Sequence, residues 1–291
     1  MSARPGTAGS QGRDGMQTSI IESDRPAIRL EDVRIVRSGT TVLDGFTLDV
    51  PAGKVTAVMG PSGSGKTTVL KLVTGQLQPS QGTVRIGDTD VHALDRRALN
   101  RLRRHIGVLL QNGALLTDLT VFDNVALPLR EHTSLPESLI RRVVLLKLQA
   151  VGLRGAADLY PQQLSGGMSR RVATARALAL DPDLMLYDEP FAGLDPISLA
   201  AGGRLIRQIN RVLGITSVVI THDVSEVGKF ADHACIIANG RVAASGTPDE
   251  LAESDDELVR QFMQGLPDGP VPFHIPAPDL SEALTSTGDE H

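Results

Sequence analysis

A glycine-rich loop at residues 60–67 has the composition of a phosphate-binding site. The run GPSGSGKT matches the spacing G-x-x-x-x-G-K-[ST] at every specified position, between a strand-like run and a helix-like run. Glycines let successive backbone N–H groups surround phosphate oxygens, the lysine neutralises phosphate charge, and the threonine hydroxyl can hold Mg²⁺. The residues expected to bind a nucleoside triphosphate are Gly60, Ser62, Gly63, Gly65, Lys66, Thr67 and Thr68.

Two carboxylates follow a second buried-type strand. In LMLYDEP, an apolar run leads directly into Asp188 and Glu189. Such a pair alone is more often part of a solvated loop or a helix cap. Next to a phosphate loop, one carboxylate can bind Mg²⁺ while the other polarises the attacking water. We therefore assign Asp188 to the metal and Glu189 to the general base.

Polar residues also end two further strand-like runs. Gln111 follows HIGVLL and could reach Mg²⁺ or the attacking water, whereas His222 follows SVVIT and could hydrogen-bond the γ-phosphate. Each alone is more often a solvated or structural residue. Because parallel strands end at one edge of a sheet, where ligands bind, we expect Gln111 and His222 to join the nucleotide site.

The run LSGGMSRR, residues 164–171, is a second potential anion site. Ser165 is a good helix cap, and Gly166 and Gly167 precede helix-forming residues. The free N–H groups and positive dipole at such a helix start attract anions. By itself the run equally fits a cap that serves only its own helix.

The elements that must position these residues alternate between strand and helix. Strand-like runs such as residues 27–36, 41–50, 55–60 and 216–220 interleave with helical runs such as 67–75 and 202–213. This alternation predicts an α/β fold with a mainly parallel sheet covered by helices on both faces. Strand patterns vanish from about residue 113 to 165, which predicts an inserted α-helical lobe.

The two ends of the chain differ in composition from the core. Residues 1–25 have too few large apolar side chains to offset the entropy of ordering, so we expect a disordered segment. Residues 251–291 predict a C-terminal extension that is partly helical and then extended. Val271, Phe273 and Ile275 lie among prolines there, which favours a strap on a partner over a disordered tail.

Bulk composition narrows the functional classes. The 291 residues, 41% of them hydrophobic, suffice for one large α/β domain with a lobe, and the net charge of −5 argues against nucleic acid as a partner. The five arginines of DRRALNRLRRH could form a nucleic-acid or lipid-headgroup site, but the net acidic chain and the lack of interleaved aromatic residues favour a solvated charged face. The single cysteine, Cys235, excludes an internal disulfide and fits a reducing cytosol. The absence of a long apolar run or a signal peptide predicts a soluble chain.

The set of GPSGSGKTT, VLLQNG, LSGGMSRR, LMLYDEP, AGLDP and VITHD, in that order, resembles the nucleotide-binding subunit of an ATP-binding cassette (ABC) transporter over residues 26–250. The resemblance implies a P-loop core with an antiparallel β subdomain and an inserted helical lobe. It makes Lys66 and Thr67 part of the Walker A loop, and Asp188 with Glu189 the Walker B pair. It likewise implies a Q-loop Gln111, a D-loop Asp195 and a switch His222, with ATP and Mg²⁺ as ligands.

The resemblance also implies a partner for the second anion site. In this family, two cassettes meet head to tail, so that Ser165, Gly166 and Gly167 contact the γ-phosphate held by Lys66 of a second copy. Two ATP molecules then close a homodimer, and hydrolysis releases it.

Further runs resemble the ATPases of the Mla-type MCE phospholipid transporters, among them FDNVALPLREHTSLPESLI, LSGGM and QGLPDGPVPF. This resemblance implies an ATPase on the cytoplasmic face of the inner membrane, bound to a permease that moves phospholipids and so maintains outer-membrane lipid asymmetry. It further implies an MCE-domain protein and a STAS-domain regulator on the helical lobe, and a C-terminal strap on the second cassette.

Two positions depart from the common cassette pattern. Arg37 stands where many cassettes place an aromatic residue on the adenine, so that a stacked guanidinium beside Val42 and a merely exposed side chain both remain open. Met168 replaces a common glutamine, and its apolar side chain suits packing.

Three other functions compete with phospholipid transport. An importer ATPase for a small polar solute fits the same motifs. A cassette ATPase acting on DNA or the ribosome is disfavoured, because a long coiled-coil insertion or second cassette is lacking. The intact Lys66, Asp188, Glu189 and His222 argue against a non-hydrolysing assembly module.

Overall fold

A six-stranded sheet forms the centre of the protein in the computed structural model, which describes residues 19–21, 25–224 and 226–270. The strand order is β10-β9-β3-β8-β7-β6, and every neighbouring pair is parallel except β10 with β9. All five residues of β3 are buried because both faces of this sheet are covered. The strands are β3 (Val55–Met59), β6 (Ile106–Leu109), β7 (Leu184–Asp188), β8 (Thr216–Ile220), β9 (His233–Ala238) and β10 (Arg241–Gly246).

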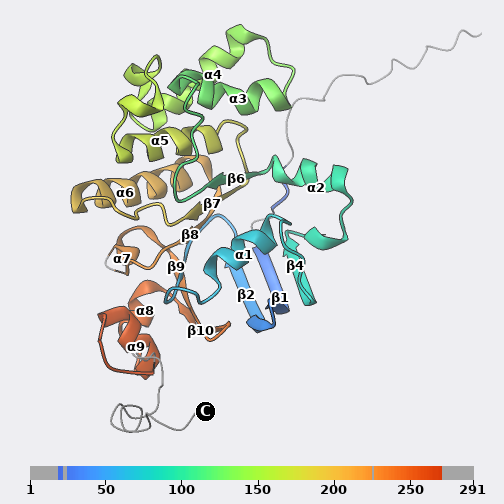
Figure 1. The fold of residues 1–291 in the computed structure, drawn as a ribbon, viewed down its shortest axis with the longest axis vertical. Coiled ribbons are helices and arrows are strands. Elements are labelled where there is room, and N and C mark those ends of the chain that lie inside the picture. The colour runs from blue at the N-terminus through green and yellow to red at the C-terminus, as the bar shows by residue number, and fades with distance from the viewer. Residues whose placement is uncertain (1–18, 22–24, 225, 271–291) are drawn as a thin grey trace, which may run out of the picture.

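A four-stranded antiparallel sheet, in the order β2-β1-β4-β5, packs over one side of this core (Figure 1). Apolar residues alternate with polar ones along its long strands, and one face contributes Ile28, Leu30 and Leu48 to a shared core with the parallel sheet. Its strands are β1 (Pro26–Arg37), β2 (Thr40–Pro51), β4 (Gln81–Ile86) and β5 (Thr89–Asp90).

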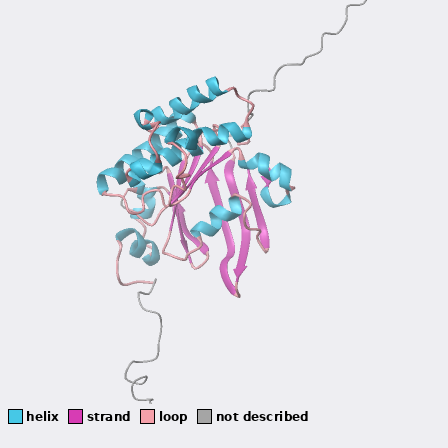
Figure 2. Cartoon of the chain, turned by 45° about the horizontal axis from the view of Figure 1, so that its top comes forward, coloured by secondary structure: helices cyan, strands magenta, loops and turns pink. Residues whose placement is uncertain are grey.

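Helices cover the sheets, and most of them lie at the top and left of the view in Figure 2. A second apolar cluster joins the other face of the parallel sheet to the C-terminal helices, and includes Tyr187, Phe191 and Phe230. The core helices are α1 (Lys66–Val73), α2 (Arg96–Arg103), α6 (Pro196–Leu213), α7 (Val227–Phe230), α8 (Pro248–Ala252) and α9 (Glu257–Gln264). Short 3-10 helices are η1 (Val91–Ala93), η2 (Arg154–Ala156) and η3 (Pro161–Gln163).

A helical lobe with its own apolar core lies between β6 and β7 in the sequence. It consists of α3 (Val121–His132), α4 (Glu137–Ala150) and α5 (Gly166–Ala177). Thr120 caps α3, since its hydroxyl accepts a hydrogen bond from the Asp123 N–H. Asn124 is fully buried, and its amide bonds the backbone of Leu116, Leu119 and Thr120. These contacts fix the path from the sheet into the lobe.

The predicted α/β architecture is confirmed: a mainly parallel sheet, an antiparallel sheet and inserted helices. Cys235 lies fully buried in β9, where burial raises the pKa of its thiol to about 12. No helix in the described ranges is both long and apolar enough to cross a membrane. The disorder expected for residues 1–25 and the strap expected from Val271, Phe273 and Ile275 fall mostly or wholly outside the described residues.

Candidate functional site

The glycine loop connects β3 to α1 and has a backbone that only glycine tolerates at two positions. Gly60 has φ +147°, and a Cβ there would lie 2.2 Å from the Ile237 carbonyl oxygen. Gly65 has φ +103°, and a Cβ there would lie 2.8 Å from the Leu43 side chain. Gly63, at φ +81°, has open space around it. The loop is therefore pressed against the core on one side and open on the other.

The start of α1 leaves donors free for an anion. Gly65 is the N-cap and provides no side-chain cap, so the first N–H groups of α1 have no side-chain acceptor from it. The Ser64 hydroxyl is buried and has no hydrogen-bond partner among the described residues, while Thr67 is exposed. A buried orphan hydroxyl, uncapped N–H groups and an accessible threonine together fit the phosphates of a nucleotide and a magnesium ion.

The Lys66 side chain is buried inside the glycine loop and donates hydrogen bonds to two of its carbonyl groups. The residue is 8% exposed, and its Nζ donates to the carbonyl oxygens of Gly60, at 2.8 Å, and Pro61, at 2.9 Å. Burial lowers its pKa, and the charges of Glu189 and Asp188 oppose that effect. The ammonium group thus remains close to two carboxylates that lie more than a hundred residues later in the sequence.

Asp188 ends β7 as expected, next to the phosphate loop. It pairs with Ile220 of β8 and is partly buried. Burial raises the pKa of its carboxyl, the neighbouring charge of Glu189 adds to the rise, and Lys71 and Lys66 oppose it. A nearby cation stabilises the ionised form of a carboxylate that is poorly solvated in this way. This fits the metal-binding role expected for Asp188.

Glu189 and His222 meet directly. His222 Nδ1 donates to Glu189 Oε2 at 2.8 Å, and the histidine side chain is 62% exposed whereas that of the glutamate is 15% exposed. Glu189 has φ +47°, in the left-handed region, and its N–H donates to the Ile220 carbonyl oxygen. A non-glycine residue in this conformation is strained, and such strain concentrates at functional sites.

Gln111 lies on an exposed loop immediately after β6. Arg176 of α5 holds this loop, because its guanidinium donates to the carbonyl oxygens of Gly113 and Ala114, both at 2.8 Å. Burial lowers the Arg176 pKa. The sequence interpretation missed Arg176, although its position on the helix that follows LSGG was a usable signal. It links the Gln111 loop to α5.

The helix start at Ser165 has the predicted capped form. The Ser165 hydroxyl accepts from the Met168 N–H at 3.2 Å, and Ser165 and Gly166 are exposed. A Cβ at Gly166 would have nothing within 4 Å. Met168 packs against the core of the helical lobe, as its apolar side chain suggests. This helix start is accessible, and no hydrogen bond or ion pair between described residues joins it to the glycine loop at α1.

Asp195 caps α6 in the described structure. Its carboxylate accepts from the N–H groups of Ile197 and Ser198, both at 3.0 Å, and hydrogen bonding, first from the Ser198 hydroxyl, lowers its pKa. A second residue that the sequence interpretation missed lies nearby: the guanidinium of Arg170 donates to the Ala192 carbonyl oxygen. Arg170 thereby ties α5 to the loop that carries Asp195.

Val42 and Arg37, the two residues considered for contact with the adenine ring, lie in different surroundings. The Val42 side chain lies 3.6 Å from the Cβ position of Gly65, which puts it beside the phosphate loop. Arg37 ends β1, pairs with Thr40 and is exposed. Val42 thus lies beside the phosphate loop, while its packing on the adenine ring and the stacking by Arg37 stay predictions.

Comparisons with known proteins agree with this fold. The family model described as ABC transporter matches residues 43–192. The chain belongs to that family and is an ATP-hydrolysing, nucleotide-binding cassette. Among solved structures, cbiO1 from Clostridium perfringens, part of the ABC transporter complex cbiONQ, has a TM-score of 0.74 at 31% identity, covering 84% of this chain and 96% of that one.

Two further relatives are informative. The chain is 52% identical over 257 residues, 88% of its length and 97% of the relative's, to the intermembrane phospholipid transport system ATP-binding protein MlaF of Haemophilus influenzae. It also resembles the cassette MJ0796 in a dimeric post-hydrolysis state bound to ADP and Pi, with a TM-score of 0.69, 32% identity and coverage of 76% of this chain and 98% of that one.

Proposed function

We propose that this chain is the ATP-hydrolysing subunit of an inner-membrane ABC transporter that moves phospholipids between the inner and outer membranes and maintains outer-membrane lipid asymmetry. The observation that carries the proposal is the 52% identity to a phospholipid transport ATPase along 97% of that relative. The site supports the ATPase part of the proposal, because phosphate-binding, metal-binding and water-activating groups meet beside α1 and β7.

Phosphate binding is the first task of the site. The uncapped N–H groups of α1 bind phosphate oxygens, and Lys66, whose Nζ lies against the carbonyl oxygens of Gly60 and Pro61 at the loop, contacts the β- and γ-phosphates. Val42 packs on the nucleotide, with Arg37 stacked on the base. Thr67, Asp188 and Gln111 would hold Mg²⁺, which would neutralise charge on the phosphates.

Water activation is the second task. Glu189 orients the attacking water and accepts its proton. His222, whose Nδ1 donates to Glu189, also contacts the γ-phosphate of bound ATP. The histidine therefore connects the state of the phosphate to the position of the general base.

A second copy of the chain completes each site. Ser165, Gly166 and Gly167 of one copy contact the γ-phosphate held by the other, and Asp195 lies at the interface between the copies. Arg170 and Arg176 carry motion of α5 to the Asp195 and Gln111 loops, since each bonds the backbone of one loop. ATP binding closes the homodimer, and hydrolysis reopens it and drives the permease.

The proposal also includes the surroundings of this subunit. It lies peripherally on the cytoplasmic face of the inner membrane through a permease, with a STAS-domain regulator and an MCE-domain protein as further partners. Residues 26–250 form the ATPase domain, with the lobe at about 113–165, preceded by the segment 1–25 and followed by the extension 251–291.

Purification of the tagged full chain from membranes tests the lipid-transport part of the proposal. We expect a permease to accompany it and phospholipid to accompany the permease, as measured by mass spectrometry of proteins and lipids. Recovery of a soluble solute-binding protein in place of bound phospholipid would instead identify an importer for a small polar solute. A Glu189→Gln chain is a suitable bait, because slow hydrolysis preserves the assembled state.

A further inference from the structure

Helix α2 displays an unusually basic face at the edge of the molecule, at the right of Figure 1. Five arginines occur between Arg96 and Arg104 in a chain whose net charge is −5. At about 100° per residue, four of them fall within an arc of about 140°, in the order Arg96, Arg104, Arg97 and Arg101. The opposite side of the helix carries Leu99 and Leu102, which pack on the core. The face is thus held outward by apolar packing.

The charges on this face are not neutralised within the described ranges. All five arginines are exposed, and no carboxylate among the described residues forms an ion pair with any of them. Of the five, only the Arg103 guanidinium donates hydrogen bonds within the described residues, to the carbonyl oxygens of Thr74 and Gly75 and to the Asn100 side chain. A concentration of unpaired guanidinium groups produces a local positive potential despite the acidic chain.

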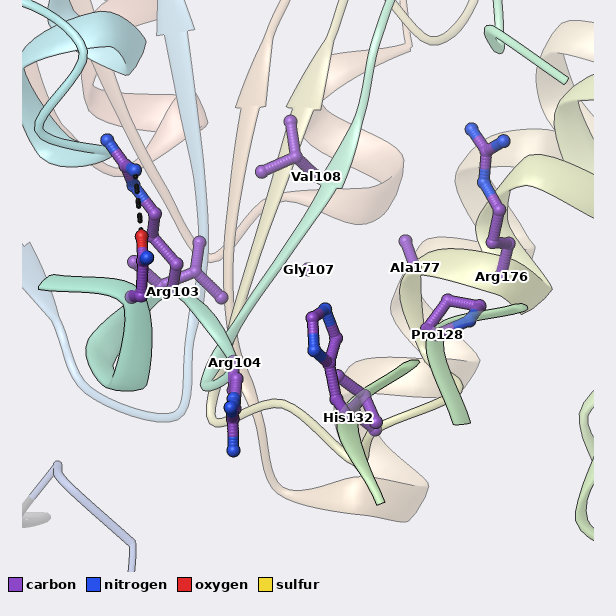
Figure 3. A pocket seen from close by; sticks show the side chains of 11 residues that line it. Arg103, Arg104, Gly107, Val108, Pro128, His132, Arg176 and Ala177 are labelled. Carbon is purple, nitrogen blue, oxygen red and sulfur yellow. Dashed lines mark hydrogen bonds between the residues drawn. The ribbon is translucent and has the colours of Figure 1, made fainter. Parts of the chain in front are cut away.

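The basic face continues into a hollow of about 480 Å³ beside β6. Figure 3 shows Arg103 and Arg104 on one side of this hollow, with His132 of α3 and Arg176 of α5 across from them. Among the residues that the structure describes, no aspartate or glutamate lines it. Arginines from α2 and α5 therefore line one recess, which extends the basic character beyond a single helix.

We propose that the arginine face of α2 binds the anionic phospholipid headgroups of the membrane surface. Guanidinium groups match phosphate oxygens with paired N–H donors, and clusters of this size attract anionic leaflets. The exposed face contains only arginines and Asn100, so it lacks the apolar or aromatic anchor that a protein interface requires at its centre. It also lacks the aromatic residues that stack nucleic-acid bases.

The inference rests on the proposed location of this chain at a membrane, and it adds a direct lipid contact to attachment through a permease. Its test uses the purified full chain without a permease. Sedimentation with phosphatidylcholine vesicles is compared with sedimentation with vesicles in which about a third of the lipid is phosphatidylglycerol. We expect binding only to the anionic vesicles, and a steep loss when ionic strength rises from about 0.05 to about 0.5 M.

Substitution of arginines on α2 tests whether this helix makes the contact with the vesicle surface. Arg97→Gln with Arg101→Gln keeps good helix formers and should weaken binding to anionic vesicles about thirtyfold. The matched control, Arg142→Gln with Arg211→Gln, removes the same charge from exposed positions on α4 and α6 and should change binding less than about threefold. ATP hydrolysis and the melting temperature, measured in parallel, should match the wild type for both variants.

Several results would overturn the inference. They are equal binding to neutral and anionic vesicles, equal losses in the two double variants, or unchanged vesicle binding by the α2 variant. Unchanged vesicle binding together with lost recovery of the permease would assign the face to a protein. Each of these results leaves the ATPase proposal intact, whereas recovery of a solute-binding protein from membranes would overturn phospholipid transport alone.

Discussion

The helix starts at Lys66 and at Gly166 share glycines and free N–H groups, yet their surroundings differ completely. The first is enclosed: Gly60 and Gly65 press against Ile237 and Leu43, and Lys66 is buried beneath them. The second is open, since Ser165 and Gly166 are exposed and the serine caps only its own helix. One start is enclosed by its own chain, whereas the other is exposed and therefore accessible to a second molecule.

The largest predicted effect belongs to the enclosed start. Lys66→Ala removes the ammonium group to which we assign the phosphates, so both nucleotide binding and hydrolysis should fall, the latter by at least about a thousandfold. Nucleotide affinity by calorimetry and the rate of phosphate release measure the two effects. Lys54→Ala, an exposed lysine ahead of β3, is the control and should behave as wild type. Unchanged affinity in Lys66→Ala would contradict the assigned role.

A substitution at the exposed helix start of α5 should abolish ATP hydrolysis but spare ATP binding by the monomer. Ser165→Arg places a bulky side chain where a partner's phosphates would lie, and hydrolysis and ATP-dependent dimer formation should be lost. Affinity of the monomer for ATP should change by less than about threefold, because the cap lost at α5 costs only about 1 kcal/mol and lies outside the loop. Light scattering and calorimetry measure both quantities, with Ser165→Thr as the capping control. Loss of ATP binding by the monomer would show that this helix start serves its own nucleotide.

Removal of the general base separates binding from chemistry at the enclosed site. Glu189→Gln keeps the size of the side chain but cannot accept a proton, so hydrolysis should fall about 10²–10³-fold. ATP affinity should be retained, and a closed dimer should accumulate on a sizing column. Turnover at the wild-type rate would remove Glu189 from the base role.

Candidate site residues could be selected from the sequence where the signal was local, and not where it was long-range. Lys66, Asp188 and Ser165 could be selected because loop spacing, a strand end and a helix cap are each encoded within a few residues, and their roles stay predictions. The contacts of Arg170 with Ala192 and of Arg176 with Gly113 join residues 22 and 63 positions apart. Such pairs depend on how α5 packs against two loops, which no periodicity specifies.

The direct contact between Glu189 and His222 illustrates the same limit. Both residues were expected at one edge of the sheet, since they end the neighbouring strands β7 and β8. Their hydrogen bond also requires the left-handed backbone at residue 189, and no sequence rule predicts that conformation for a glutamate.

The smallest predicted effect concerns the contact of Arg37 with the adenine base of ATP. Arg37→Ala should weaken ATP binding about two- to fivefold if the guanidinium stacks on adenine, because an exposed stacking contact contributes about 0.5–1 kcal/mol. The hydrolysis rate at saturating ATP should not change. Competition with a nucleotide that lacks the base provides the control, since its affinity should be the same for the wild type and the variant. Equal ATP affinity of the variant would mean that Arg37 is simply exposed.

The mixing of two inactive variants tests most directly whether the open start completes a partner's site. In a mixed dimer of Lys66→Ala with Ser165→Arg, one site combines both defects and the other combines the intact loop of one copy with the intact helix start of the other. Shared sites therefore predict that mixing restores ATP hydrolysis, toward about a quarter of the wild-type rate for random pairing of independent sites. A mixture as inactive as its two components would contradict the account.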